Sequence, residues 1–120
     1  MNPDELAEQY IAVWNERDPE LRSQRIAELW VPAGEHYVQS RKVVGYEELE
    51  QRVRESHDKW VRDAGNRFRA VPGARQQSDI VTFYWEMLPG AGDTVRGKGL
   101  EFVVVSDTGK ILRDHQFYPA

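Results

Sequence analysis

The segments IVTFYWEML (residues 80–88) and LEFVVV (residues 100–105) decide the fold of this chain. Both are rich in aromatic and β-branched residues, which favour strands with at least one buried face. Each segment also carries one carboxylate, Glu86 in the first and Glu101 in the second. A carboxylate in such a strand faces either solvent or a cavity, and the pattern of the two segments alone allows both.

The sequence before these segments predicts three amphipathic helices. The first begins at the N-cap Asn2 and ends near Asn15 or Arg17, and the second begins at the N-cap Asp18. We expect Pro32 and Gly34 to end the second helix. The third helix covers residues 46–63, and a mostly solvated surface is expected for its charged residues, namely Glu47, Glu48, Glu50, Arg52, Arg54, Glu55 and Lys59.

Strands account for most of the remaining chain. Residues 35–44 read as one irregular strand, and residues 67–71 alternate polar and apolar side chains. Residues 89–93 form a hairpin loop leading into the strand that ends at residue 105, in which Gly97 and Gly99 allow a bend. Residues 111–118 close the sheet.

This order of helix, helix, strand, helix and four strands predicts a single α+β domain over residues 1–120. Each helix has one apolar stripe, so all three helices should pack on one face of a strongly bent antiparallel sheet. The chain length is sufficient for a hydrophobic core without disulfides, and the sequence contains no cysteine.

Composition argues against several classes of function. The net charge of −4 gives no electrostatic basis for binding nucleic acid or an anionic membrane. No apolar stretch approaches the ~20 residues of a membrane span, and the acidic start does not resemble a signal peptide, so we expect a cytoplasmic protein. The sequence lacks a phosphate-binding glycine loop, and its three histidines lie far apart. We therefore expect neither a cofactor nor a metal site.

The aromatic side chains suggest a pocket between helices and sheet. Tyr10 and Trp14 lie one helical turn apart on the same face, and Phe83 and Trp85 share one face of a strand. Such rings either fill the core or line a hollow that would accept an apolar ligand. Both alternatives are open at this level.

Acidic side chains could supply the chemistry of such a pocket. Glu101 shares a strand face with Val103; if that face is concave, burial would raise the pKa of the carboxyl group. If it is not, Glu101 faces solvent and pairs with a cation. Asp114 shares one face of the last strand with Gln116 and Tyr118, but parity does not say which face is inward, and a bulge would exchange the faces.

Several segments together resemble one known superfamily: YIAVWNERD (10–18), ELW (28–30), VVGYEEL (43–49), VTFYWEM (81–87) and GLEFVVVSDTGKI (99–111). They are similar to nuclear transport factor 2-like proteins, within the group of SnoaL-like polyketide cyclases and ketosteroid-isomerase-like proteins. The resemblance implies a cone in which a curved antiparallel sheet wraps around helices, a cystatin-like α+β barrel. It also implies a pocket at the mouth of the cone and a homodimer.

The resemblance also implies roles for individual residues. Tyr10 falls at the position of the oxyanion-binding tyrosine of ketosteroid isomerase, and Glu101 at that of its protonated carboxylic acid. The general base of that enzyme would lie near Val38 or Gln39, neither of which can remove a proton. Asp114, on the last strand, is the candidate proton-transfer partner. The predicted ligand-binding residues are Trp14, Trp30, Tyr37, Gln39, Trp60, Phe83, Trp85, Val103, Gln116 and Tyr118.

These observations leave competing functions. The first is an enzyme of isomerase, cyclase or hydrolase type that acts by acid-assisted chemistry on a small hydrophobic molecule with a ring or a carbonyl group. The second is a non-catalytic ligand-binding or dimerisation module. In a third reading, the domain's own side chains fill the pocket and the domain serves only as an interaction surface. We also expect a homodimer through apolar residues on the outer sheet face, drawn from Tyr84, Leu88, Phe102 and Phe117.

Overall fold

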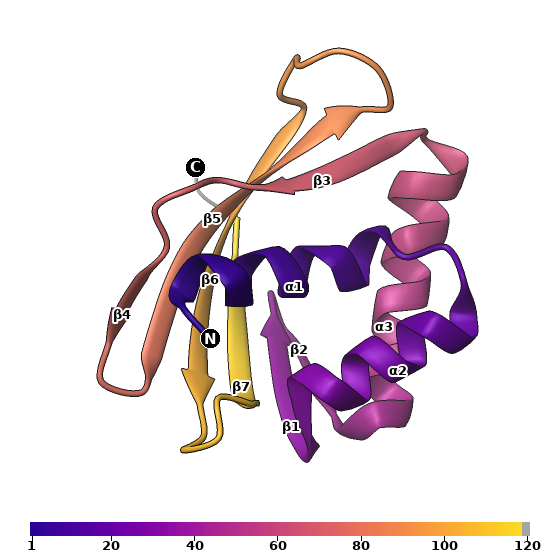
Figure 1. Cartoon of the computed structure of the whole chain (residues 1–120). Helices are drawn as coiled ribbons and strands as arrows, with labels where there is room; N and C mark the ends of the chain where they lie inside the picture. The colour runs from indigo at the N-terminus through magenta and orange to yellow at the C-terminus, as the bar shows by residue number, and fades with distance from the viewer. Residues whose placement is uncertain (119–120) are drawn as a thin grey trace.

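Three helices lie on the concave side of a curved sheet in the computed structural model, which describes residues 1–118 (Figure 1). The helices are α1 (Pro3–Asn15), α2 (Pro19–Leu29) and α3 (Gly45–Ser56), and α3 continues into the π-helical segment η1 (His57–Asp63). The strands are β1 (Trp30–Val38), β2 (Arg41–Val44), β3 (Asn66–Ala70), β4 (Arg75–Gln77), β5 (Ile80–Pro89), β6 (Gly97–Val105) and β7 (Ile111–Phe117).

The strand order is β2-β1-β7-β6-β5-β3, with β4 paired to the edge of β5. The predicted α+β class and the three helices packed against a curved sheet are confirmed. The prediction of an all-antiparallel sheet is wrong at one pair, because β1 and β7 run parallel. These two strands are joined by most of the chain and not by a hairpin, so no tight turn imposes an antiparallel direction on them. The sheet is open and does not close into a barrel.

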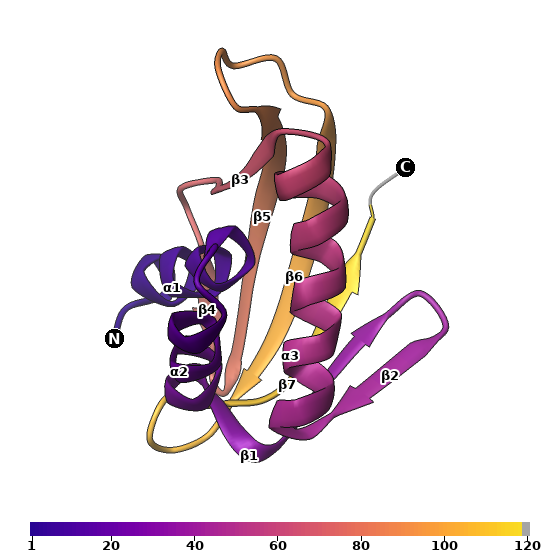
Figure 2. The same ribbon diagram turned by 90° about the vertical axis from the view of Figure 1, so that its right-hand side faces the viewer.

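The helix starts follow the capping signals in the sequence. The side chain of Asn2 accepts a hydrogen bond from the backbone N–H of Glu5 at 2.8 Å, and Asp18 accepts one from Glu20 at 2.9 Å. The predicted end of the second helix is wrong, because α2 ends at Leu29 and Trp30 already begins β1. Figure 2 shows α1 and α2 to one side of the sheet and α3 crossing in front of β6 and β7.

The single strand predicted over residues 35–44 is instead a hairpin. β1 and β2 pair antiparallel up to Val38 and Arg41, and Gln39 in the turn between them has a φ of 52°. Glycine or asparagine ordinarily marks such a left-handed turn position. Here a glutamine occupies it, so the sequence carries no turn signal at this point.

Residues 80–89 and 97–105 form the antiparallel pair at the middle of the sheet. Trp85 lies opposite Gly99, and a Cβ atom at residue 99 would be 2.0 Å from the indole of Trp85. The glycine thus leaves space for this indole to lie across the neighbouring strand, a role beyond the bend that the sequence predicted.

A β-bulge sets the orientation of the last strand. Arg113 pairs with Val104, but the next pairing joins Ile111 to Val105, so Leu112 is left unpaired. As a result Ile111 and Asp114 are both fully buried although they are three residues apart. Parity alone did not show which face of β7 points inward. With the bulge in place, Asp114 faces the interior.

The outer sheet face carries exposed aromatic side chains. Tyr84 and Phe117 expose 55% and 53% of their surface, and they lie in one row across β5, β6 and β7. Leu88, also predicted for this patch, is fully buried. Its cross-strand partner Arg67 donates to the carbonyl oxygen of Gly92 at 3.0 Å, which holds the loop after β5 at this end of the sheet. Among the described residues, no helix is both long and apolar enough to cross a bilayer.

Candidate functional site

A cavity of about 430 Å³ lies between the concave sheet face, α1 and the α3–η1 helix. This volume is within the range of sites for small molecules. Aromatic rings form much of its wall: Trp14 from α1, Trp60 from η1, Phe68 from β3 and Trp85 from β5. The described structure thus contains a hollow between helices and sheet, which disfavours the reading in which the domain's own side chains fill it.

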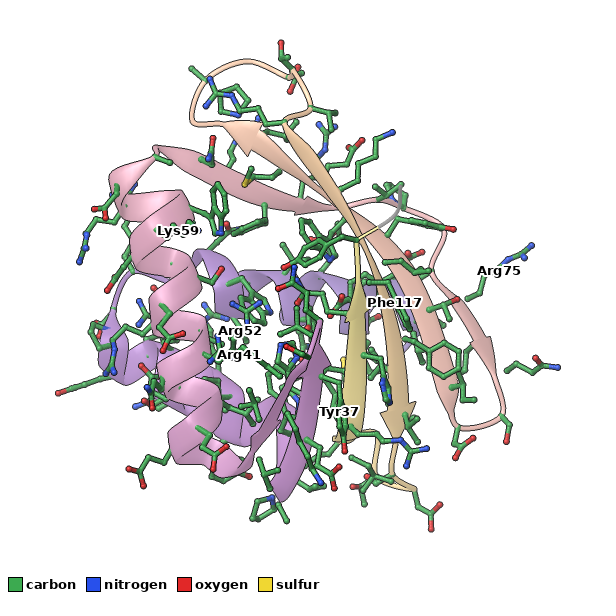
Figure 3. The ribbon with its side chains drawn as sticks, turned by 180° about the vertical axis from the view of Figure 1, so that it is seen from behind. Tyr37, Arg41, Arg52, Lys59, Arg75 and Phe117 are labelled. Carbon is green, nitrogen blue, oxygen red and sulfur yellow. The ribbon has the colours of Figure 1, made fainter. Side chains whose placement is uncertain are left out.

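The predicted ligand-binding residues divide into three groups. Trp30, Phe83 and Val103 lie in the hydrophobic core and do not line the cavity. Tyr37 stacks on His115 with ring centroids 4.7 Å apart, beside a shallower depression, and Figure 3 shows it with Phe117 on the outer side of the sheet. The cavity is lined by the remaining members of the predicted set, namely Trp14, Gln39, Trp60, Trp85, Gln116 and Tyr118, together with Tyr10.

Charged residues of the third helix complete the cavity, and the sequence prediction missed them. Arg52 was expected on a solvated surface, yet it is only 9% exposed and lines the cavity, as do Glu55 and Lys59. Its position does carry a signal. Leu49, Arg52, Val53 and Ser56 follow the spacing of one helical face and are all buried.

A buried polar cluster, consisting of Tyr10, His36, Glu101 and Asp114, lies beneath the cavity. The hydroxyl oxygen of Tyr10 is in hydrogen-bond contact with Glu101 Oε1 and lies 2.7 Å from Asp114 Oδ2. The second oxygen of Glu101 accepts a hydrogen bond from the indole N–H of Trp85 at 3.3 Å. α1, β6 and β7 thus bring together the three residues that the sequence singled out for chemistry.

Asp114 has two further hydrogen-bond partners. The indole N–H of Trp30 donates to its Oδ1 at 3.1 Å, and His36 Nδ1 lies 2.7 Å from its Oδ2. Since a carboxylate can only accept, His36 Nδ1 carries a proton and donates it to Asp114. His36 Nε2 is buried and has no hydrogen-bond partner within residues 1–118. The sequence did not indicate His36, because nothing local shows that β1 pairs with β7.

Proton counting determines the charge state of the cluster. A phenol has one proton and can donate it to only one of its two carboxyl neighbours. The other contact requires a carboxyl group that is itself protonated and donates to the phenol oxygen. Asp114 has N–H donors on both oxygens, whereas Glu101 has only the long bond from Trp85. We therefore assign the proton to Glu101 and the negative charge to Asp114.

The environment of each group agrees with this assignment. Burial, and then the negative charge of Asp114, raise the pKa of Glu101 well above its ordinary value. Burial also raises the pKa of Tyr10, and the nearby carboxyl groups of Asp114 and Glu101 raise it further. Both shifts favour the protonated form of the group.

Of the four residues in the buried polar cluster, Tyr10 alone lines the cavity. Glu101 and Asp114 are fully buried and do not appear in the cavity wall. Val38 and Gln39 do line it, as expected for the position of a general base, but neither can accept a proton at neutral pH. Glu55, the carboxylate in the cavity wall, is paired with Arg41 at 3.1 Å. No group of acidic or histidine side chains within the described chain is arranged to hold a metal ion.

The fold is shared with many solved structures. A proposed isomerase of the SnoaL-like family, from Agrobacterium tumefaciens, superposes with a TM-score of 0.85 at 21% identity. The match covers 96% of this chain and 95% of that one. A proposed polyketide cyclase from Sinorhizobium meliloti gives 0.71 at 9% identity, with coverages of 98% and 100%. An NTF2-like protein of unknown function from Exiguobacterium gives 0.72 at 14% identity, with coverages of 95% and 98%.

These similarities confirm that the chain has the nuclear transport factor 2-like fold of SnoaL-like proteins. No protein-family model matches the sequence, and no curated protein matches it. At such low identities the shared fold carries no activity with it, so a function has to be argued from the site.

Proposed function

We propose that the protein binds a small ring-containing molecule in the cavity and assists its reaction through the hydroxyl group of Tyr10. The observation that carries this proposal is the position of Tyr10, which forms part of the cavity wall while its oxygen contacts two buried carboxyl groups. Aromatic walls suit an apolar ring, and a single polar group at the floor suits an oxygen of the same ligand.

The proposed chemistry starts from the hydrogen bonds of the resting site. At rest Tyr10 donates to Asp114 and accepts from the protonated Glu101. A ligand carbonyl oxygen would compete with Asp114 for the phenol proton, and Asp114 would keep its bonds from Trp30 and His36. Negative charge that develops on the ligand oxygen would then be stabilised by Tyr10, itself supported by Glu101.

This arrangement favours acid-assisted reactions, such as enolisation or ring closure. Neither Val38 nor Gln39 can accept a proton from carbon, and the carboxylate of Glu55 is paired with Arg41, so water would take that proton. A proton that passes from the phenol to the ligand oxygen would be replaced from the protonated Glu101, whose carboxyl group contacts the phenol oxygen. We therefore propose a cyclase-like or hydrolase-like reaction in preference to base-driven isomerisation.

The second candidate is a ligand-binding module without catalysis. One observation favours it: Glu101 and Asp114 have all their hydrogen bonds inside the protein and no access to the cavity. In that case the buried polar cluster would hold α1 to β1, β6 and β7, and the cavity would only bind.

Replacing Tyr10 with phenylalanine tests both candidates. With 2-tetralone in D₂O, we expect the wild-type protein to accelerate deuterium exchange next to the carbonyl group, followed by NMR. Loss of one oxyanion donor should lower the accelerated rate by about 10²–10³-fold in Tyr10→Phe. Tryptophan fluorescence should report 2-tetralone binding in both proteins, because Trp14, Trp60 and Trp85 line the cavity.

Tyr84→Phe is the matched control, since it removes a hydroxyl group from the exposed outer face. This variant should behave like the wild type in both measurements. Binding of 2-tetralone without any accelerated exchange would reject catalysis of this type and favour the binding module. Absence of binding to both 2-tetralone and 2-naphthol would reject the cavity as a site for ring compounds altogether.

We also propose that a second copy of the chain covers the outer sheet face. Supporting this is a row of Phe117, Leu100 and Tyr84 across three neighbouring strands, two of them more than half exposed. Exposed aromatic side chains that lie together commonly mark an interface, and a two-fold dimer is the simplest one.

Sedimentation at micromolar concentration is expected to give twice the 13.9 kDa mass of the chain. Phe117→Glu should shift the protein to monomer, because it places a charge within the proposed interface. Leu21→Glu changes an exposed apolar residue on α2, away from this face, and should leave the dimer intact. A wild-type protein that is entirely monomeric at this concentration would reject the dimer.

A further inference from the structure

One buried cation in the cavity wall has no acidic partner among the residues that the structure describes. Arg52 projects from α3 and is 9% exposed, yet within residues 1–118 its guanidinium group makes no ion pair and no hydrogen bond. Its Nε atom is fully buried without a partner. Its recorded contact is with the ring of Trp14, whose centroid lies 5.0 Å from the guanidinium carbon. An unpaired buried charge is costly to keep for stability alone.

Arg22 shows how the same chain accommodates a structural arginine. This residue is 2% exposed, but its side chain donates to the carbonyl oxygen of Glu16 at 2.9 and 3.1 Å and pairs with Glu50 at 3.4 Å. Arg52 has no such partners, although both side chains are buried at the helical layer. The difference indicates that the partner of Arg52 lies outside residues 1–118, and the cavity that Arg52 lines is open to a ligand.

The surroundings of Arg52 extend this positive site. Arg41, Lys59 and Lys98 also line the cavity, whereas Glu55 is the carboxylate in its wall and is already paired with Arg41. Figure 3 labels Arg52 and Arg41 between the helix and the sheet, and Lys59 further along the helix that carries Arg52. The cavity wall is therefore cationic, while the whole chain has a net charge of −4.

We infer that the cavity takes a carboxylate-bearing ring compound, with the carboxylate on Arg52 and the ring against Trp14. A guanidinium group binds a planar carboxylate through two parallel hydrogen bonds. Trp14 connects the two ends of the site, because its ring contacts Arg52 on one side and lies 6.0 Å from the ring of Tyr10. This inference rests on the proposed ligand cavity and names the substrate class.

Paired probes that differ only in charge test the inference. We expect the wild-type protein to bind 2-naphthoate at least ~10-fold more tightly than the neutral 2-naphthamide, measured by quenching of tryptophan fluorescence. Arg52→Gln should remove this preference while retaining binding of 2-naphthamide. Arg54→Gln makes the same charge change at an exposed position of α3 and should keep the preference.

The outcomes distinguish this inference from the proposed function. Binding of 2-naphthamide with no preference for 2-naphthoate would overturn the carboxylate site and leave the ring-binding cavity in place. Absence of binding to 2-naphthamide and 2-naphthoate alike would overturn both. Tighter binding of 2-naphthyl phosphate than of 2-naphthoate, lost in Arg52→Gln, would replace the carboxylate by a phosphate group.

Thermal unfolding without ligand provides a second, independent readout. Arg52→Met retains the aliphatic contact with Trp14 and removes the unpaired charge, so the Tm should rise by ~2–8 °C. Arg22→Met should lower the Tm, because the carbonyl oxygen of Glu16 and the carboxylate of Glu50 lose their donor. An equal fall in both variants would identify Arg52 as a structural arginine and overturn the inference.

Discussion

Replacing Asp114 with alanine is expected to lower the free energy of unfolding by about 3–5 kcal/mol, the largest loss that we predict for a single side chain. The carboxylate contacts Tyr10, Trp30 and His36, all within a fully buried site. Without it, three buried donors lose their acceptor at once, and the short alanine side chain offers no acceptor in its place.

Chemical denaturation of Asp114→Ala and Asp114→Asn measures this effect. Asparagine keeps the shape of the side chain but has one acceptor oxygen in place of two. The free energy of unfolding should therefore fall in Asp114→Asn, but by less than in Asp114→Ala. Asp107→Ala removes a carboxylate from the exposed turn before β7, and its unfolding free energy should stay within about 0.5 kcal/mol of the wild type. If the free energy of unfolding of Asp114→Ala lay within about 1 kcal/mol of the wild type, the hydrogen bonds assigned to Asp114 would be wrong.

Glu101→Gln is expected to stabilise the protein increasingly as the pH rises above about 5. Glutamine reproduces the protonated acid, because its amide can donate to Tyr10 and accept from Trp85, but it cannot ionise. Burial and the charge of Asp114 raise the pKa of Glu101 in the folded state above its ordinary value. The folded wild-type protein therefore holds a proton that the unfolded chain releases.

The sign of the pH dependence follows from this difference in bound protons. The contribution of Glu101 to stability is fully present below the pKa of the unfolded chain and is lost as the pH rises towards the folded pKa. In that interval the wild type should lose up to ~1.4 kcal/mol per pH unit relative to Glu101→Gln. Urea unfolding at pH 5, 6, 7 and 8 measures the divergence.

Glu86→Gln is the matched control for this measurement. Glu86 lies on the neighbouring strand and pairs with Arg69 at 2.7 Å on the sheet surface. Its substitution should not create a growing advantage with pH, because the carboxylate of Glu86 lies at the sheet surface beside the guanidinium group of Arg69. Parallel pH profiles for Glu101→Gln and the wild type would mean that Glu101 is ionised in the folded protein and that the proton assignment is incorrect.

Local signals in the sequence predicted much of the fold. Capping residues such as Asn2 and Asp18 act within one helical turn, and the strand residues 80–88 and 100–105 select their conformation by side-chain shape. The prediction failed where no local signal exists. Gln39 adopts a turn conformation usually marked by glycine, and Trp30 begins a strand although its spacing continues the second helix.

For the candidate site, helical spacing alone predicted that Tyr10 and Trp14 lie on one face. Residue type alone showed that Glu101 is an acid within an apolar strand. Tertiary structure decided the rest. The unpaired Leu112 turns Asp114 inward, and the parallel pairing of β1 with β7 brings His36 to it. Bulges and long-range strand pairing depend on contacts between segments distant in sequence, and these carry no signature in either segment alone.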